Sequence, residues 1–436
     1  MKVGTRSHPP GSGGLPPTPE SWLPKEHNLY RPRHSLRQRT ALVSAIVFFL
    51  VPALAFVVGV RPTAFENRAL HGFPSLGSGW AFFTGLSAWA TDQLPLRQAG
   101  VEAANGISTG VFGDPPGSGR AGTQGGPSVL GPQDQRPPTP PAENYPPLIF
   151  GSDGWIYLGA DVSNKCAPTL NSAEVVRAFQ RLRAAVESSG RRFELIIAPD
   201  KSTELPEHLP ASYPGRDCSR AVSDQFWRDA TQLGNIDLRP SLAATTARVG
   251  HPLYDPNDTH WNYEGGLTMT YALAERLQPG ITASWTAKPG RVNPWPADLP
   301  PLIGKSENRH LQTYSLAPDG TADRSHYVAS DFRTPLHLQQ NTAEPGKGVI
   351  GGKVTLIADS FTQFASPFLA AAFQDVSIVH TETMAANPTA EATQLLADRD
   401  TVVVELAERN AAGGASPLLE ESVIDQIAAV LANNPR

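Results

Sequence analysis

An uninterrupted apolar run dominates the amino-terminal part of this chain. Residues 41–60 read ALVSAIVFFLVPALAFVVGV and contain no charged side chain. In helical conformation a run of this length crosses the hydrocarbon core of a bilayer, so it predicts one transmembrane helix. Four arginines between residues 31 and 39 precede the run, and only Arg61 follows it closely. Because positive charge stays on the cytoplasmic side, we expect the amino terminus inside the cell and everything after residue 60 outside. The run continues past the small residues at 53–55, which favours an uncleaved signal anchor over a cleaved signal peptide.

The rest of the chain divides by composition. Residues 1–40 are polar and rich in Pro and Gly, which predicts a disordered cytoplasmic tail. Residues 61–112 carry apolar side chains at helical spacing and are expected to form a juxtamembrane helical segment. A second Pro/Gly-rich stretch, 113–147, is expected to be a linker. Residues 148–436 are enough for one sizeable domain.

From residue 148 onwards, short β-branched runs alternate with amphipathic helical patterns. Strands are expected at 193–198, 236–238, 354–357, 376–379 and 401–404. Helices are expected from Asn171 or Ser172 to Gly190, and at 219–233, 264–277 and 363–373. This alternation predicts an α/β domain with a mostly parallel sheet covered by helices on both faces. The stretch from about 280 to 350 lacks the rhythm, and we interpret it as an irregular excursion over the sheet.

Charge and cysteine content narrow the functional classes. The formal net charge is only -5 and 18% of residues are charged, so no global field would attract nucleic acid or a strongly acidic polymer. The two cysteines, Cys166 and Cys218, lack the spacing of a zinc site. In an oxidising compartment they are expected to pair, and closing a loop of about 50 residues contributes roughly 3 to 4 kcal/mol. Two buried, unpaired thiols are the alternative.

Two short strings contain residues of catalytic type. Residues 258–261 (DTHW) lie in a loop just before an expected helix. An Asp two positions before a His can hold the imidazole in one tautomer and stabilise its charged form. Residues 358–361 (ADSF) follow an expected strand and precede a helical pattern. A serine at such a turn stands at the carboxyl edge of the sheet, where N–H groups at a helix start can stabilise an oxyanion.

Together and in this order, the two strings resemble the AlgX/AlgJ-like family of SGNH hydrolase-like acetyltransferases. In that family an Asp-x-His-Trp string precedes a Gly-Asp-Ser string, whereas ordinary SGNH esterases have the reverse order. This chain has Ala358 in place of the family's Gly. Flanking strings agree over residues 65 to 410: ENR at 66–68, DQLPLR at 92–97, GSDGWIYL at 151–158, APDKSTELPEHLP at 198–210 and ELAERN at 405–410.

The resemblance implies an SGNH-like fold and a function. The enzyme would move an acetyl group through a serine acyl-enzyme onto hydroxyls of an extracytoplasmic polysaccharide. Ser360 would be the nucleophile, His260 the general base and Asp258 its orienting partner, which makes chemical sense because serine needs a base to become nucleophilic. No bound cofactor is implied. A separate protein of the membrane-bound O-acyltransferase type would supply the acetyl group.

Four further residues are candidate substrate contacts. Lys201 and Ser202 follow an expected strand, at the sheet edge where substrate would bind, although solvated loop residues are as simple an interpretation. Trp261 could stack on a sugar ring or be buried. Arg409 could bind a glycan hydroxyl or pair with Glu405 or Glu408.

Three other functions stay open on sequence grounds. An acetyl-esterase would use the same triad with water as acceptor. An inert SGNH-like scaffold or glycan-binding protein would not need the complete set of Asp, His and Ser. A metal-dependent hydrolase would need a third ligand beside Asp258 and His260, and none stands at a ligand-like spacing, so no metal is expected.

Overall fold

The computed structural model describes residues 36–60, 72–75, 80–93, 95, 145–328, 330–339 and 347–436. The chain forms two compact units, residues 1–64 with 69–97, and residues 65–68 with 98–436. Most of the expected tail at 1–40 and of the expected linker at 113–147 lies outside the described residues.

The described residues of the first unit include the helices α1 (Leu36–Val57) and α2 (Trp80–Asp92). The rings of Phe56 and Trp89 meet edge to face, with centroids 6.0 Å apart. The helix α2 lies within the stretch 61–112 that was expected to be helical, and most of the rest of that stretch lies outside the described residues. The start of α1 corrects the tail boundary, because the helix begins inside the stretch expected to be disordered. In the part of the chain that the structure describes, no helix combines the length and apolarity needed to cross a bilayer, so the transmembrane helix expected at 41–60 is not confirmed.

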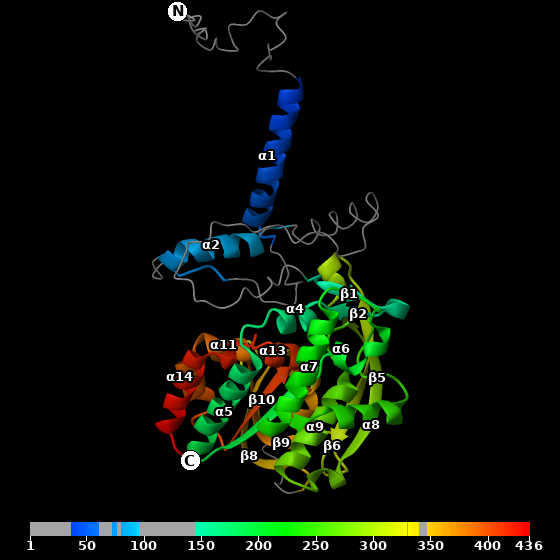
Figure 1. Ribbon diagram of the computed structural model, residues 1–436, viewed down its shortest axis with the longest axis vertical. Coiled ribbons are helices and arrows are strands. Elements are labelled where there is room, and N and C mark those ends of the chain that lie inside the picture. Colours follow the sequence, from blue (N-terminus) through cyan, green and yellow to red (C-terminus); the bar gives the residue numbers. More distant parts are fainter. Residues whose placement is uncertain are drawn as a thin grey trace, which may run out of the picture. The chain divides into compact units, whose positions relative to one another are not determined.

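A six-stranded sheet organises the second unit (Figure 1). Its order is β4-β3-β10-β8-β9-β7, and every neighbouring pair is parallel except β7 with β9. The strands are β3 (Arg192–Ala198), β4 (Ile236–Asp237), β7 (Leu336–Gln339), β8 (Ile350–Ala358), β9 (Phe373–His380) and β10 (Thr401–Ala407). All five expected strands are confirmed, and so is the mostly parallel sheet.

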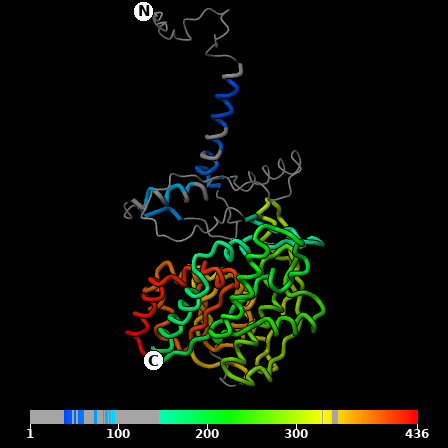
Figure 2. The backbone as a smooth tube through the Cα atoms, viewed as in Figure 1, coloured from blue at the N-terminus to red at the C-terminus, as the bar shows by residue number. Residues whose placement is uncertain are grey.

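Helices connect the strands, and the expected helical patterns are found. The longer ones are α5 (Ser172–Ser188), α7 (Arg216–Ala230), α8 (Arg239–Val249), α9 (Tyr263–Leu277) and α14 (Glu421–Ala432). The shorter ones are α4 (Ala160–Cys166), α6 (Lys201–Glu204), α10 (Ser366–Ala372), α11 (Thr381–Ala386), α12 (Pro388–Leu395) and α13 (Glu408–Ala412). The helix α5 starts at a capping box, in which Asn171 and Glu174 each satisfy the other's backbone N–H. Figure 2 shows α14 beside α5, so the last helix of the chain packs against one of the first of the domain.

Alternating side chains of the strands enter two hydrophobic cores. On β3, Ile196 belongs to the core that α9 and α10 cover, whereas Leu195 and Ile197 belong to the core that α5, α7 and α14 cover. Strands buried on both faces have few polar positions, which explains the apolar runs in the sequence.

The stretch from 280 to 350 is more regular than the sequence indicates. An antiparallel pair, β5 (Thr286–Pro296) and β6 (Asn308–Ala317), forms a separate two-stranded sheet with a register shift between Pro289 and Val292. A short 3-10 helix, η8 (Pro300–Ile303), lies between the two strands. A second small pair joins β1 (Leu148–Phe150) to β2 (Ile156–Leu158). The expectation of an irregular excursion is therefore wrong for β5 and β6, because the three prolines of β5 hide the strand pattern.

A disulfide links Cys166 in α4 to Cys218 in α7, with 5.8 Å between the Cα atoms. The expected pairing is confirmed.

Candidate active site

Ser360 stands where β8 ends. Asp359 caps the 3-10 helix η9 (Ser360–Phe364), and its Oδ1 accepts the backbone N–H of Phe361 at 3.1 Å. Its Oδ2 accepts the N–H of Ala407 at 2.6 Å, which ties the turn to the end of β10. Ser360 itself is only partly buried, so its hydroxyl is open to a substrate.

His260 reaches Ser360 from a loop that precedes α9. Its Nε2 lies 2.8 Å from Ser360 Oγ, and its Nδ1 lies 3.0 Å from Asp258 Oδ1. The backbone N–H of His260 donates to the same carboxylate oxygen at 2.9 Å. Asp258 and His260 are buried, at 2% and 5% exposure. The expected convergence of the three side chains at the carboxyl edge of the sheet is confirmed.

Two contacts hold the histidine loop against the serine turn. Trp261 is fully buried, and its Nε1–H donates to the carbonyl of Phe361 at 3.0 Å. Gly266 in α9 lies so close to η9 that a Cβ would collide with the carbonyl of Phe364. Of the two alternatives for Trp261, burial and stacking on a sugar, the structure favours burial.

Two residues of the β5–β6 region complete the surroundings of the histidine. Asp298 Oδ2 lies 3.4 Å from His260 Nδ1, and Asp298 Oδ1 accepts the N–H of Thr259 at 2.7 Å. Arg309 in β6 places its Nε 3.3 Å from Asp258 Oδ2. Neither residue was predicted, because both come from the stretch with no interpretable pattern. No spacing in the sequence signals their contact with the 258–261 string.

The charge on Arg309 keeps Asp258 ionised. Burial raises the pKa of this carboxyl, but Arg309 and the hydrogen bond to His260 outweigh burial and lower the pKa to about 2. Arg309 is itself buried and donates to the carbonyl oxygens of His260 and Trp261 at 3.3 and 3.4 Å. The loop therefore has a fixed negative charge on the far side of the imidazole from Ser360.

The side chain of Lys201 supports this loop and is too deeply buried to contact a substrate. Its Nζ donates to the carbonyl oxygens of Asp255, Pro256 and Asp258 at 3.1, 3.2 and 2.7 Å. The side chain is 1% exposed, and burial lowers the pKa of Lys201 to about 8. The expected substrate contact by Lys201 is corrected to a structural one.

Arg409 and Ser202 make different contacts. Arg409 is buried, and its Nη1 donates to Asp200 at 3.0 Å and lies 3.6 Å from Asp161. It pairs with neither of the two glutamates that were expected as partners. Ser202 lines a separate cavity of about 310 Å³ next to Lys165. The burial and ion pairs of Arg409 favour the alternative of a structural role, whereas substrate contact by Ser202 stays a prediction.

Asp258, His260 and Asp298 are also the residues most able to hold a metal ion. One potential ligand atom from each lies within 4.8 Å of the others. Asp298 is a third potential ligand, 38 positions or more from the other two in sequence, so no spacing in the sequence indicates it. The contacts of His260 Nδ1 with both carboxylates, and of Arg309 with Asp258, account for this cluster as a hydrogen-bonded and charge-paired group.

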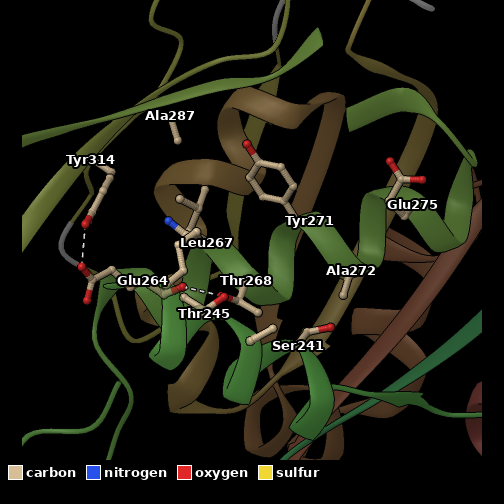
Figure 3. A pocket seen from close by; sticks show the side chains of 12 residues that line it. Ser241, Thr245, Glu264, Leu267, Thr268, Tyr271, Ala272, Glu275, Ala287 and Tyr314 are labelled. Carbon is tan, nitrogen blue, oxygen red and sulfur yellow. Dashed lines mark hydrogen bonds between the residues drawn. The ribbon is translucent and has the colours of Figure 1, made fainter. Parts of the chain in front are cut away.

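A cavity of about 610 Å³ lies along α9 (Figure 3). Residues of α8 and α9 form most of its wall, and β5 and β6 contribute Ala287 and Tyr314. Tyr314 Oη donates to Glu264 Oε1 at 2.5 Å on one side of the cavity. None of the three converging residues lines it, so we assign this cavity no part in their chemistry.

Comparison with known proteins places the chain in a family. Residues 148–403 match the family described as SGNH hydrolase-like domain, acetyltransferase AlgX. The chain belongs to this family. A probable alginate O-acetylase AlgJ of Pseudomonas syringae pv. tomato is 25% identical over 226 residues, which are 50% of this chain and 52% of that protein. The chain thus spans about half the length of this curated relative.

Solved structures of low identity are also similar. The O-acetyltransferase domain of Pseudomonas putida AlgJ is 17% identical with a TM-score of 0.43, covering 65% of this chain and 98% of that one. Pseudomonas aeruginosa AlgX is 16% identical with a TM-score of 0.44, covering 66% of this chain and 67% of that one.

Proposed function

We propose that this protein is a polysaccharide O-acetyltransferase that carries the acetyl group on Ser360. The carrying observation is the hydrogen-bonded line from Ser360 through His260 to Asp258, in a member of an acetyltransferase family. Serine is a weak nucleophile unless a base removes its proton, and His260 Nε2 is within hydrogen-bonding distance to do so.

The proton moves between Ser360 and His260 in both half-reactions. In the first, Ser360 Oγ attacks the acetyl carbonyl carbon of the donor while its proton passes to His260 Nε2. The bond to the donor's leaving group then breaks, and the leaving group takes that proton. In the second, a sugar hydroxyl gives its proton to Nε2 and attacks the acyl carbon, and Ser360 Oγ leaves with the proton. Asp258 stabilises the imidazolium that exists between these transfers.

The relatives support a polysaccharide acceptor, since one of them is named a probable alginate O-acetylase. The disulfide between Cys166 and Cys218 supports an extracytoplasmic location, because disulfides persist in oxidising compartments. Attachment to the membrane through residues 41–60 stays a prediction from the apolar run. Protease added to intact cells should remove the domain that follows Val60, and a protected domain would contradict that topology.

The acetyl donor is proposed to reach the site through a separate membrane-bound O-acyltransferase-type protein. No cofactor of this chain's own is proposed. Cells that lack every such acyltransferase should lose acetylation of the glycan. Unchanged acetylation in those cells would contradict this part of the proposal.

One incubation separates transfer from hydrolysis. The protein is mixed with an activated acetyl ester, with and without oligosaccharide, and both protein and glycan are analysed by mass spectrometry. Acetylated glycan that requires Ser360 supports transfer, whereas free acetate at the same rate with and without glycan identifies an esterase. A protein that turns over neither substrate would be an SGNH-like scaffold.

The carboxylates near His260 call for a chelator control. Serine-based transfer is expected to be unchanged by EDTA. Loss of activity in EDTA that Zn²⁺ restores would instead support a metal-dependent hydrolase at Asp258, His260 and Asp298.

A further inference from the structure

The second carboxylate beside the imidazole of His260 has a role of its own. We propose that Asp298 is a positioning residue that stabilises the protonated imidazolium of His260 during acetyl transfer. This inference rests on the proposed function, because it assumes that His260 accepts the proton of Ser360.

Asp298 is held in place independently of the histidine. Its Oδ1 accepts the N–H of Thr259 at 2.7 Å, and its own N–H donates to Asp258 Oδ2 at 3.1 Å. These two bonds connect the segment after β5 to Asp258 and Thr259 of the catalytic loop. The remaining oxygen, Oδ2, lies 3.4 Å from His260 Nδ1, the nitrogen that also faces Asp258.

The charges around His260 explain why the carboxylate of Asp258 alone does not stabilise the imidazolium fully. Arg309 Nε lies 3.3 Å from Asp258 Oδ2, and Arg309 Nη1 lies 3.2 Å from Asp255 Oδ2. The guanidinium therefore cancels much of the negative charge that Asp258 would present to an imidazolium. In a buried site such charges are weakly screened, so the loss matters more than it would in water.

A count of the charged side chains around His260 leads to the same conclusion. The carboxyl groups are Asp255, Asp258 and Asp298, and the positive groups are Lys201 and Arg309. Burial and the charge of Asp258 raise the pKa of Asp298, and its proximity to His260 opposes that rise, so the count below takes all three carboxyl groups as ionised. The rings of Phe361 and Phe364 also pack on His260, with centroids 5.1 and 5.7 Å away, and they carry no charge. With neutral His260 the cluster has an excess of one negative charge, and the proton from Ser360 neutralises it. Without the charge of Asp298 the same proton would leave a net positive cluster.

Asp298→Asn separates this role from a merely structural one. Asparagine keeps an oxygen that can accept the N–H of Thr259, but it loses the charge. Glu307→Gln is the matched control, because Glu307 lies in the same segment between β5 and β6 and is exposed. Its carboxylate accepts a 3.3 Å hydrogen bond from Asn257, and the same chemical change at Glu307 leaves the imidazole of His260 untouched.

The test measures kcat and KM for an activated acetyl ester between about pH 5 and pH 9, the range in which histidine titrates. For Asp298→Asn we expect kcat to fall on the order of 10-fold to 100-fold with little change in KM, a smaller loss than the ~10⁴-fold of a triad Asp→Asn change, because Asp258 remains. The acidic limb of the kcat/KM profile should move to lower pH by about 1 unit, because a missing negative charge makes protonation of the base harder. Glu307→Gln should match the parent protein in both respects.

Three results would overturn the inference. The first is an Asp298→Asn variant with parental kcat and pH profile. The second is a lower kcat that accompanies a lower unfolding midpoint while the pH profile stays unmoved, which is the mark of a structural role. The third is an equal shift of the profile in Glu307→Gln. Ser360→Ala in the same assay keeps the two proposals apart, because its inactivity supports the serine chemistry whatever Asp298 does.

Discussion

Replacing Arg309 by methionine should destabilise the domain, because the buried carboxylate of Asp258 would lose its positive partner. The guanidinium is 3% exposed, pairs with Asp258 and Asp255, and lies over the ring of Phe364 at 4.4 Å. Methionine fills a similar volume but leaves Asp258 buried without its cation. Breaking a buried ion pair by removing one partner costs about 3 to 5 kcal/mol, so we expect a loss of that size at pH 7.

The pH dependence of this loss follows from the pKa of Asp258. In the folded protein it is lowered to about 2, against an ordinary value of 3.8. A depressed carboxyl pKa contributes stability above the ordinary value, and that stability is lost as pH falls through the folded value. A shift of this size corresponds to about 2 kcal/mol. The variant lacks the main cause of the shift, so the difference in unfolding free energy between parent and variant should narrow by about 2 kcal/mol from pH 6 towards pH 2.

Urea unfolding at several pH values measures both quantities. Arg291→Met is the matched control, since Arg291 is an exposed arginine of β5, the partner strand of β6. Its unfolding free energy should change by less than about 0.5 kcal/mol at every pH. The reasoning fails if Arg309→Met loses less than about 1 kcal/mol at pH 7, or if its loss is the same at low and neutral pH.

Three other changes test separate parts of the structure. Replacing both Cys166 and Cys218 by alanine should lower the unfolding free energy by about 4 kcal/mol, since the disulfide closes a loop with a sequence separation of 52. If a reducing agent leaves the thermal unfolding of the parent protein unchanged, this prediction is contradicted. Lys201→Met should cost about 1 to 3 kcal/mol in urea unfolding, because the carbonyl oxygens of Asp255, Pro256 and Asp258 lose the donor that Lys201 supplies. An unchanged midpoint would mean that the loop is stable without this side chain. Gly266→Ala should lower kcat on the order of 10-fold to 100-fold, because the Cβ of the alanine pushes on the carbonyl of Phe364 and displaces the serine turn. Full activity of this variant would show that the turn has room to move.

Local patterns were enough to predict the sheet. The strands at 193–198 and 401–404 are β-branched runs buried on both faces, and such runs are visible in sequence. The place of Ser360 follows from the end of a predicted strand, because the carboxyl ends of parallel strands share one edge of the sheet. Asp258 and His260 stand in a loop before a helix, and only the resemblance of the two strings to a family indicated that they would meet Ser360.

Contacts that depend on tertiary packing could not be predicted in this way. Lys201 and Trp261 have polar neighbours in the sequence, and only the folded chain buries them. Asp298 and Arg309 belong to a Pro-rich stretch whose two strands lack an alternating pattern, so neither their pairing nor their approach to His260 has a local signal. Prolines remove ladder hydrogen bonds, but an isolated two-stranded sheet tolerates them. The high proline content of the 280–350 stretch therefore did not exclude strands, although we interpreted it as irregular.

Trapping the acetyl-enzyme is the most direct test of the central claim. The purified protein is mixed with an activated acetyl ester, quenched within the first turnover and digested for mass spectrometry. The account predicts one acetyl group on the peptide that contains Ser360, and no label in Ser360→Ala under the same conditions. An acetyl group on a different residue, or labelling of Ser360→Ala at the parental rate, would contradict it.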